Sequence, residues 1–332
     1  MPRRPTALND FVGQHRVIAE LRDIITGARS RGVVVPSLCL VGPSGAGKTM
    51  LAQAIAREWS ATPPGATPSN LKRIFGGRGI AATLVSTLAK LEYGDILFID
   101  ETHAVDRKDQ ELLYAALDDH KTFALRPNGS LDRSTTISIA EFTLVAATTE
   151  PGGLAKALRT RLHSIVLDPY KPRELKEIAE RIAAGRGIDM TAQAARHLAE
   201  RSQQTPRSLE KLLEMLALTV PTTTRVTQSV MRDYLDRRGI DEHGFDPLQR
   251  QLIDLLSHTR GHTANLTVIT AKLGVDKNYI RADVEPLLIE RKLIDIGPTG
   301  RTLTASGIEL AAAMKRKEAA EEPADTQEEE VL

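Results

Sequence analysis

The stretch "CLVGPSGAGKTMLAQAIA", Cys39 to Ala56, decides the fold class of this chain. An apolar run ends in three glycines and a lysine, and a helical pattern of apolar residues follows directly. A buried strand followed by such a loop and then by a helix gathers free backbone N–H groups around one point, which suits a bound polyanion. The sequence therefore predicts a phosphate-binding strand–loop–helix unit.

The loop itself matches the P-loop pattern G-x-x-x-x-G-K-[ST] without a mismatch. Lys48 is expected to reach the β- and γ-phosphates of ATP, and the Thr49 hydroxyl to bind Mg²⁺. A chance glycine-rich turn is the alternative, but it does not explain the apolar strand before the motif and the helix after it. The expected phosphate-binding set is Gly42, Gly45, Ala46, Gly47, Lys48, Thr49 and Met50.

A second motif, "ILFIDE" (96–101), places two carboxylates at the end of another apolar run. Asp100 is expected to hold Mg²⁺ through its water, and Glu101 to polarise the attacking water. An acidic cap on the next helix would explain this motif if it stood alone. Because both motifs occur in one chain, about 50 residues apart, a P-loop ATPase is the better interpretation. His103 is a candidate relay of the nucleotide state, although a structural role is the more common one for a single histidine.

Further candidates follow along the chain. "LVAATT" (144–149) ends a strand in hydroxyls, and Thr149 is a candidate contact to the γ-phosphate or the attacking water. Arg159, Arg161 and Arg207 are candidates for neutralising charge during phosphoryl transfer. If such an arginine comes from a neighbouring subunit, hydrolysis requires a ring. Threonines that cap a strand and solvated surface arginines are the structural alternatives.

Composition places the chain among ordinary globular proteins. It has 332 residues, 41% of them apolar and 26% charged, with a net charge of +1. Any contact to DNA must therefore come from local patches or from assembly. The single Cys39 leaves no internal disulfide and no cysteine-rich zinc site. No apolar run has membrane-spanning length and the N-terminus lacks a signal-peptide pattern, so we expect a cytoplasmic protein without a membrane contact.

Periodicity predicts the domain order. Strands alternate with helices up to about residue 169, which predicts an α/β domain with a mainly parallel sheet. Residues 170–240 show only helical periodicity and predict a small helical domain. Residues 241–310 combine short helices with two strands around a tight turn, which indicates a winged helix. The acidic end, 311–332, is expected to be a disordered tail.

These motifs, in this order, resemble the RuvB family. The segments that carry the resemblance are "FVGQ", "GPSGAGKT", "GDILFIDETH", "LLYAALDDH", "FTLVAATT", "ALRTRL", "TPRSLEKLL" and "VEPLLIERKLIDIGPTGR". They span about residues 3 to 303. The resemblance implies an AAA+ P-loop ATPase domain (1–169), a helical lid (170–240) and a DNA-binding winged helix (241–310). It implies an ATP- and Mg²⁺-dependent, helicase-type motor, a hexameric ring that drives Holliday-junction branch migration in recombination and repair.

The resemblance also assigns roles to single residues. Thr149 and Arg207 match the two sensors of the γ-phosphate. Arg161 matches the arginine finger that one subunit offers to the next, with Arg159 as the alternative choice. Arg301 matches a wing contact to DNA phosphate. The remaining residues matched to the nucleotide site or the subunit boundary are Arg3, Arg4, Tyr170, Asp118, Asp119 and His120. The hairpin at 123–139 resembles the one that RuvB offers to RuvA.

Several positions depart from the family pattern. Ile296 stands where a second wing arginine is expected, and Glu150 stands where an arginine usually follows the sensor threonines. The hairpin is also less apolar than in the family, with Arg126, Asn128 and Asp132 in it. Together these departures concern the DNA contact and the RuvA partnership, and the ATP motifs are intact. They favour a divergent copy, such as a phage or mobile-element version with another partner. The alternatives are an ATP-gated winged-helix DNA-binding switch or loader, with Lys277, Asn278 and Arg281 on a recognition helix, and a protein remodeller.

Overall fold

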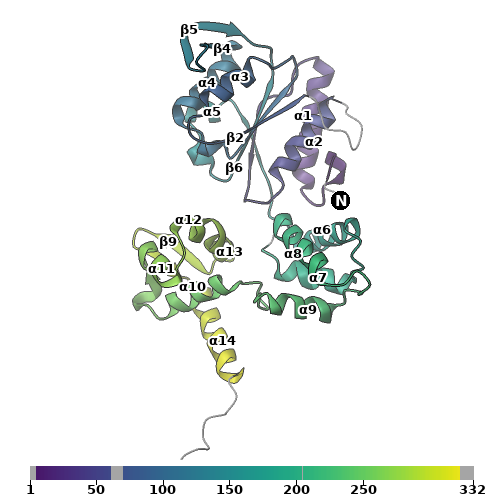
Figure 1. The fold of residues 1–332 in the computed structure, drawn as a ribbon, viewed down its shortest axis with the longest axis vertical. Coiled ribbons are helices and arrows are strands. Elements are labelled where there is room, and N and C mark those ends of the chain that lie inside the picture. Colours follow the sequence, from purple (N-terminus) through teal and green to yellow (C-terminus); the bar gives the residue numbers. More distant parts are fainter. Residues whose placement is uncertain (1–4, 61–69, 204, 322–332) are drawn as a thin grey trace, which may run out of the picture. The chain divides into compact units, whose positions relative to one another are not determined.

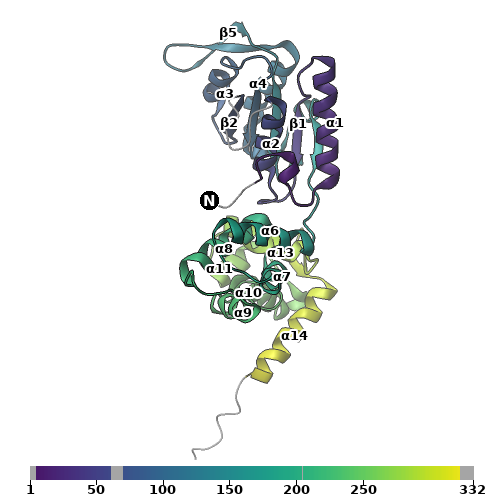
Figure 2. The same ribbon diagram turned by 90° about the vertical axis from the view of Figure 1, so that its right-hand side faces the viewer.

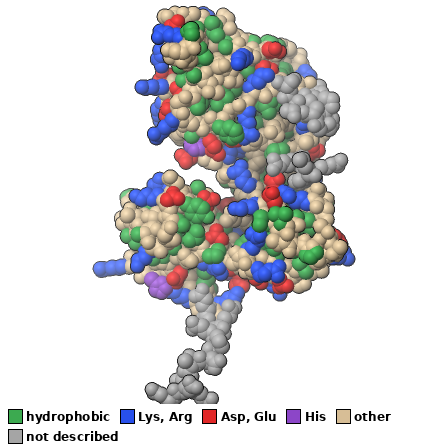
Figure 3. All heavy atoms as spheres, viewed as in Figure 1, with side chains coloured by type: hydrophobic (Ala, Val, Ile, Leu, Met, Phe, Trp, Pro, Cys, Tyr) green, Lys and Arg blue, Asp and Glu red, His purple; other side chains and the backbone are tan. Residues whose placement is uncertain are grey.

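The computed structural model describes residues 5–60, 70–203 and 205–321. The chain divides into two compact units, 1–229 and 230–332. In the described part of the chain, no helix has both the length and the apolar character needed to cross a membrane. On the face drawn in Figure 3, acidic and basic side chains are interspersed, as a net charge of +1 would suggest.

A five-stranded parallel sheet organises the first unit and confirms the predicted fold class. Its strands, in the order in which they pair, are β2 (Leu71–Phe75), β3 (Ile96–Asp100), β6 (Thr143–Thr148), β1 (Leu38–Val41) and β7 (His163–Val166). Because β6 pairs with both β1 and β3, the carboxyl ends of these three strands meet at one edge. The P-loop, the Asp–Glu motif and the "AATT" segment are therefore brought together by topology.

Helices cover both faces of this sheet (Figure 1), because its strands are apolar on both sides. On one face, Leu38, Leu40 and Phe98 share a core with α1 (His15–Arg31) and α2 (Lys48–Ser60). On the other face, Cys39 and Leu97 share a core with α3 (Ala81–Leu88) and α4 (Arg107–Asp119). A short helix, α5 (Lys156–Arg159), precedes β7. We call this part of the first unit the sheet domain.

The predicted hairpin is present and projects from the sheet domain (Figure 2). Its antiparallel strands are β4 (Lys121–Leu125) and β5 (Leu131–Ser138), with a register shift between Phe123 and Ala124. Most of β5 is solvent-exposed. The edge strand β2 was missed by the sequence interpretation, because Ile74 is the one buried residue of this strand.

The first unit continues into a helical lid, which we define as α6 (Pro172–Gly185), α7 (Ala192–Arg201) and α8 (Pro206–Thr219). Small and branched apolar side chains, such as Leu175, Ala195 and Leu213, form its interior. Pro206 occupies the first turn of α8, and the Thr205 side chain accepts a hydrogen bond from Ser208 N. The next helix, α9 (Gln228–Arg237), spans the boundary between the two units.

The second unit consists of short helices and a three-stranded antiparallel sheet around its own core. Its helices are α10 (Pro247–Ser257), α11 (Leu266–Leu273), α12 (Lys277–Tyr279), a π-helical segment (Ile280–Val284), α13 (Glu285–Glu290) and α14 (Ala305–Glu321). Its strands are β8 (Thr263–Ala264), β9 (Ile294–Gly297) and β10 (Gly300–Leu303). This is the helix-and-hairpin arrangement of the predicted winged helix.

The first part of the expected acidic tail, residues 311–321, is helical. We expected disorder from residue 311, whereas α14 continues to Glu321. The reason is an apolar face: Ala311 is buried in the core of the second unit, and Met314 packs against that core. Residues 322–332 lie outside the described residues.

Candidate nucleotide site

The P-loop follows β1 and turns into α2 with a backbone that glycine alone adopts without strain. Gly45 and Gly47 have φ of +79° and +101°. A side chain at Gly45 would also collide with the lid, because an added Cβ would lie 2.7 Å from Arg207 Cβ and 3.2 Å from Thr205 Oγ1. The loop therefore combines positive φ with a close approach of the helical lid.

Lys48 is held inside the loop. Its Nζ donates hydrogen bonds to Gly42 O at 2.7 Å and Pro43 O at 3.0 Å, and the residue is only 5% exposed. Burial lowers the pKa of Lys48. The negative charges of Glu101 and Asp100 oppose this shift, and the positive charge of Arg207 adds to it. A bound polyphosphate would offset the burial by supplying negative charge to the ammonium group.

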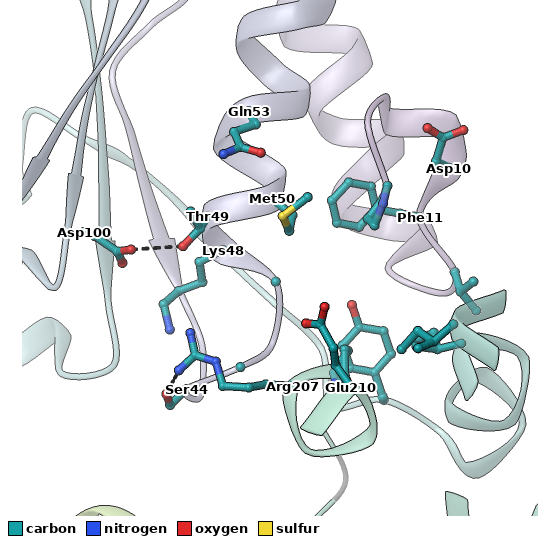
Figure 4. Close-up of a pocket in the computed structure, with 18 of the residues that line it drawn as sticks. Asp10, Phe11, Ser44, Lys48, Thr49, Met50, Gln53, Asp100, Arg207 and Glu210 are labelled. Atoms are coloured by element: carbon teal, nitrogen blue, oxygen red, sulfur yellow. Dashed lines mark hydrogen bonds between the residues drawn. The ribbon is translucent and has the colours of Figure 1, made fainter. Parts of the chain in front are cut away.

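Thr49 and Asp100 are the residues that could hold Mg²⁺. The Thr49 hydroxyl donates a hydrogen bond to Asp100 Oδ2 at 3.0 Å, which joins the P-loop to the end of β3 (Figure 4). A hydroxyl and a carboxylate are oxygen ligands of the kind that Mg²⁺ prefers. The residues present therefore fit the metal that a P-loop site requires.

Glu101, the proposed catalytic base, directly follows β3 with φ of +50°, an uncommon backbone for a residue with a side chain. One of its carboxylate oxygens, Oε2, is buried and makes no hydrogen bond, and His103 Nδ1 lies 3.5 Å away. The same ring nitrogen lies 3.0 Å from Thr148 Oγ1. His103 thus links the end of β6 to the candidate base, a position that suits a relay.

The lid contacts the P-loop directly. Arg207 Nη1 donates a hydrogen bond to Ser44 Oγ at 3.0 Å (Figure 4), which places the candidate second sensor beside the phosphate loop. Tyr170 is buried, and its hydroxyl donates to Ala46 O at 3.2 Å. Burial raises the pKa of Tyr170 to about 12, so its hydroxyl stays protonated at neutral pH.

These side chains line a cavity of about 550 Å³. Of the residues predicted for the site, the following line it: Gly45, Gly47, Lys48, Thr49, Met50, Asp100, Glu101, Tyr170 and Arg207. Sequence reasoning missed Phe11, Val12, Ile178 and Ile182, which form an apolar part of the lining and suit the flat ring of a base. It also missed Arg73. A short sequence motif cannot predict that these residues line the cavity, because the residues come from separate helices, strands and loops.

Other predicted residues lie elsewhere. Thr149 is half-buried directly after β6, and among the described residues it is not one that lines the cavity. Arg161 also lies outside the cavity. Its guanidinium pairs with the Asp118 carboxylate, with Nε donating to Oδ1 at 2.7 Å and Nη2 donating to Oδ2, and it stacks 5.3 Å from the Tyr114 ring centroid. The hydrogen bond from Arg161 lowers the pKa of Asp118.

Arg161 and Asp118 share a shallow second pocket with His120, so three residues expected at the subunit boundary gather on one surface. Asp119 is the exposed last residue of α4. Arg3 and Arg4, predicted to lie over the adenine, fall outside the described residues.

The structure does not support the predicted role of Arg301 as a DNA contact. Its guanidinium is buried in the second unit and makes a bidentate pair with Glu285, with distances of 2.6 Å from Nε to Oε1 and 3.0 Å from Nη2 to Oε2. The two side chains are 9% and 2% exposed. Arg301 joins the wing strand β10 to α13, because a buried cation needs a partner that neutralises it.

The topology and the site together define the class of this protein. The strand–loop–helix that cradles phosphate, the carboxylates at the end of the neighbouring β3 and the arginine from the lid surround one cavity in the first unit. The chain is a P-loop ATPase whose C-terminal unit is a winged helix.

Comparison with known proteins identifies the family. Residues 3–167 match the model described as "Holliday junction DNA helicase RuvB P-loop domain", and residues 242–311 match the "RuvB C-terminal winged helix domain". The chain belongs to the RuvB family.

Individual relatives agree. The Holliday junction branch migration complex subunit RuvB of Thermotoga maritima is 33% identical over 306 residues, which cover 91% of this chain and 89% of that protein. The corresponding subunit of Corynebacterium jeikeium is 34% identical over 309 residues, or 91% and 85% of the two chains. The structure of the Thermotoga maritima RuvB Holliday junction branch migration motor matches with a TM-score of 0.77 and 30% identity, covering 93% of this chain and 98% of that one.

Proposed function

We propose that this protein is an ATP-driven DNA motor that promotes branch migration of Holliday junctions as a ring of identical subunits. The observation that carries the proposal is the division of the catalytic residues between two surfaces. Lys48, Glu101 and Arg207 line one cavity, whereas Arg161 is held by Asp118 outside it. Such a division suits a site that is completed by a second copy of the chain.

In this mechanism, each subunit binds ATP between its P-loop and its own lid. Lys48 and Arg207 neutralise phosphate charge, and Glu101 orients the water that attacks the γ-phosphorus as the bond to the bridging oxygen breaks. Mg²⁺, when held by Thr49 and Asp100, neutralises charge on the phosphate oxygens.

Arg161 of a neighbouring subunit supplies the last positive charge. Its pairing with Asp118 and Tyr114 keeps the guanidinium at a surface and oriented, which reduces the conformational freedom that it loses when it meets a phosphate. Thr149 and His103 would change their contacts at the end of β6 according to whether the γ-phosphate is present. When that phosphate leaves, Arg207 loses its partner and the lid is free to rotate.

In this proposal, the second unit contacts the DNA. With Arg301 buried, the exposed candidates are Lys277, Asn278 and Arg281, which lie on α12 and the π-helical segment. π-Helical turns often occur at functional sites. These residues also support the second candidate function, a DNA-binding switch controlled by ATP. Footprinting separates the two, because a switch protects one defined sequence and a motor does not.

The hairpin formed by β4 and β5 is the proposed docking site for a RuvA-like protein. It is exposed along β5, and its apolar Leu125 is 37% exposed. Synthetic four-way junctions test this proposal: strand exchange should require ATP and should increase when RuvA protein is added. If the isolated chain moves junctions equally well with and without RuvA, the hairpin has another role.

A complementation experiment tests the shared site. Arg161→Ala keeps an intact cavity but lacks the arginine for its neighbour, whereas Glu101→Gln offers that arginine but has no base. Each variant alone should be inactive as an ATPase, and a mixture of the two should regain part of the wild-type rate. Arg159→Ala is the matched control, since it removes a nearby arginine from the end of α5, and it should retain activity.

The result that contradicts the proposal is equally clear. Full ATPase activity of Arg161→Ala, or wild-type turnover by a protein that is monomeric at every concentration, would show that the cavity of one subunit is sufficient. Wild-type turnover by Glu101→Gln would refute the assignment of the base.

A further inference from the structure

Arg73 is a cationic residue in the nucleotide cavity to which the mechanism above gives no role. It lies on β2, where the parallel register pairs Arg73 with Phe98 and Phe75 with Asp100. Because side chains two residues apart on a strand share a face, Arg73 and Phe75 lie on the same face of β2, and both line the cavity. Asp100 lines it as well.

The guanidinium of Arg73 makes an ion pair with the carboxylate that is expected to serve Mg²⁺. Arg73 Nη2 donates to Asp100 Oδ2 at 2.9 Å, and the same oxygen accepts the hydrogen bond from Thr49 at 3.0 Å. The Asp100 side chain is only 13% exposed, which limits the screening of this pair by water.

Two aromatic rings hold the guanidinium in place. Its central carbon lies 4.3 Å from the ring centroid of Phe75 and 5.6 Å from that of Phe98. Stacking of this kind restrains a side chain that otherwise has many rotamers. The contact to Asp100 is therefore supported from two sides and does not depend on one hydrogen bond.

We propose that Arg73 competes with Mg²⁺ for Asp100, so that this site accepts metal-free nucleotide and requires more Mg²⁺ than it would without Arg73. The inference rests on the proposed function, because it assumes that the cavity binds ATP. The guanidinium must move away from Asp100 or share the carboxylate when Mg²⁺ arrives.

The size of the effect follows from Coulomb's law. If the doubly charged Mg²⁺ lay about 6 Å from the guanidinium, in surroundings with an effective dielectric constant of about 40, the repulsion would change its binding constant by about a hundredfold. The same positive charge attracts the triphosphate, so its removal should weaken the binding of nucleotide without metal. The two consequences have opposite signs, which a purely structural role for Arg73 would not produce.

The experiment measures binding of a fluorescent, non-hydrolysable ATP analogue to the full chain, first in EDTA and then along a Mg²⁺ titration. Arg73→Gln should lower the Mg²⁺ concentration at half-effect by about a hundredfold and raise the Kd of the metal-free analogue. Arg73→Leu, which keeps an apolar contact with Phe75 and Phe98, should behave in the same way. The matched control is Arg78→Gln, an exposed arginine just after β2 that does not line the cavity, and it should match wild type.

Two outcomes would overturn the proposal. The first is a Mg²⁺ titration of both Arg73 variants that superimposes on that of wild type. The second is an equal loss of affinity for the ATP analogue in EDTA and in Mg²⁺, because Arg73 would then only attract the negatively charged nucleotide. A wild-type chain that binds no analogue under either condition would instead refute the nucleotide site itself, and Arg73 with it.

Discussion

Replacement of Gly45 by alanine tests whether the lid rests on the P-loop as the structure shows. The added Cβ would lie 2.7 Å from Arg207 Cβ, whereas carbon atoms in contact are about 3.5–4.0 Å apart. The lid must therefore retreat by about 1 Å, which is enough to lengthen the 3.0 Å hydrogen bond between Arg207 and Ser44. We expect nucleotide affinity to fall by about tenfold, because Arg207 no longer reaches the phosphate position.

A second substitution separates the contact from the backbone. Gly129, at the tip of the hairpin, has the same φ of +79° as Gly45, but a Cβ there would meet no atom within 4 Å. Both alanine variants should lose about 1–2 kcal/mol of local stability from the left-handed backbone. Only Gly45→Ala should lose affinity.

The assay is a titration with a fluorescent ATP analogue, accompanied by urea denaturation of each variant. Arg207→Ala serves as the reference for a lid that cannot reach the phosphate, and Gly45→Ala should approach its affinity. If Gly45→Ala and Gly129→Ala bind the analogue within a factor of about 2 of each other, the close packing of the lid is refuted.

Three further predictions concern other buried groups. Arg301→Met leaves the Glu285 carboxylate buried without its partner. Urea denaturation should therefore show that the free energy of unfolding of the second unit falls by about 3–5 kcal/mol. A fall of less than about 1 kcal/mol would contradict the buried pair. Cys39 is buried, and burial raises its pKa to about 11. A disulfide reagent at about pH 8 should therefore modify Cys39 only after the chain unfolds. Rapid modification of the folded chain would contradict the buried position of this thiol. The pKa of Tyr170 is raised from 10.0 to about 12, so its contribution to stability is complete below pH 10 and is lost as the pH rises through about 12. Tyr170→Phe should therefore lose less stability than wild type between about pH 10 and about pH 12 in urea denaturation. An equal dependence of stability on pH in the two proteins would contradict the burial of the hydroxyl.

The nucleotide-binding motifs of this protein could be predicted from the sequence because the residues of each motif are neighbours in the chain. Lys48 and Thr49 lie within one eight-residue motif, and Asp100 and Glu101 end one apolar strand, so their types and spacing alone predicted a P-loop ATPase. The alternation of strands and helices predicted the parallel sheet for the same reason, since each element carries its own period of apolar residues. The weakly buried edge strand β2 lacks that signal, and the sequence interpretation missed it.

Only the tertiary structure decided which distant groups meet. Arg207 reaches Ser44 across 163 residues of chain, and Arg73 reaches Asp100 because β2 and β3 are neighbours in the sheet. Arg301 looked like a surface contact in the sequence and proved to be a buried partner of Glu285. A motif records which side chain stands at a position, whereas its partner and its exposure depend on elements that fold against it from elsewhere in the chain.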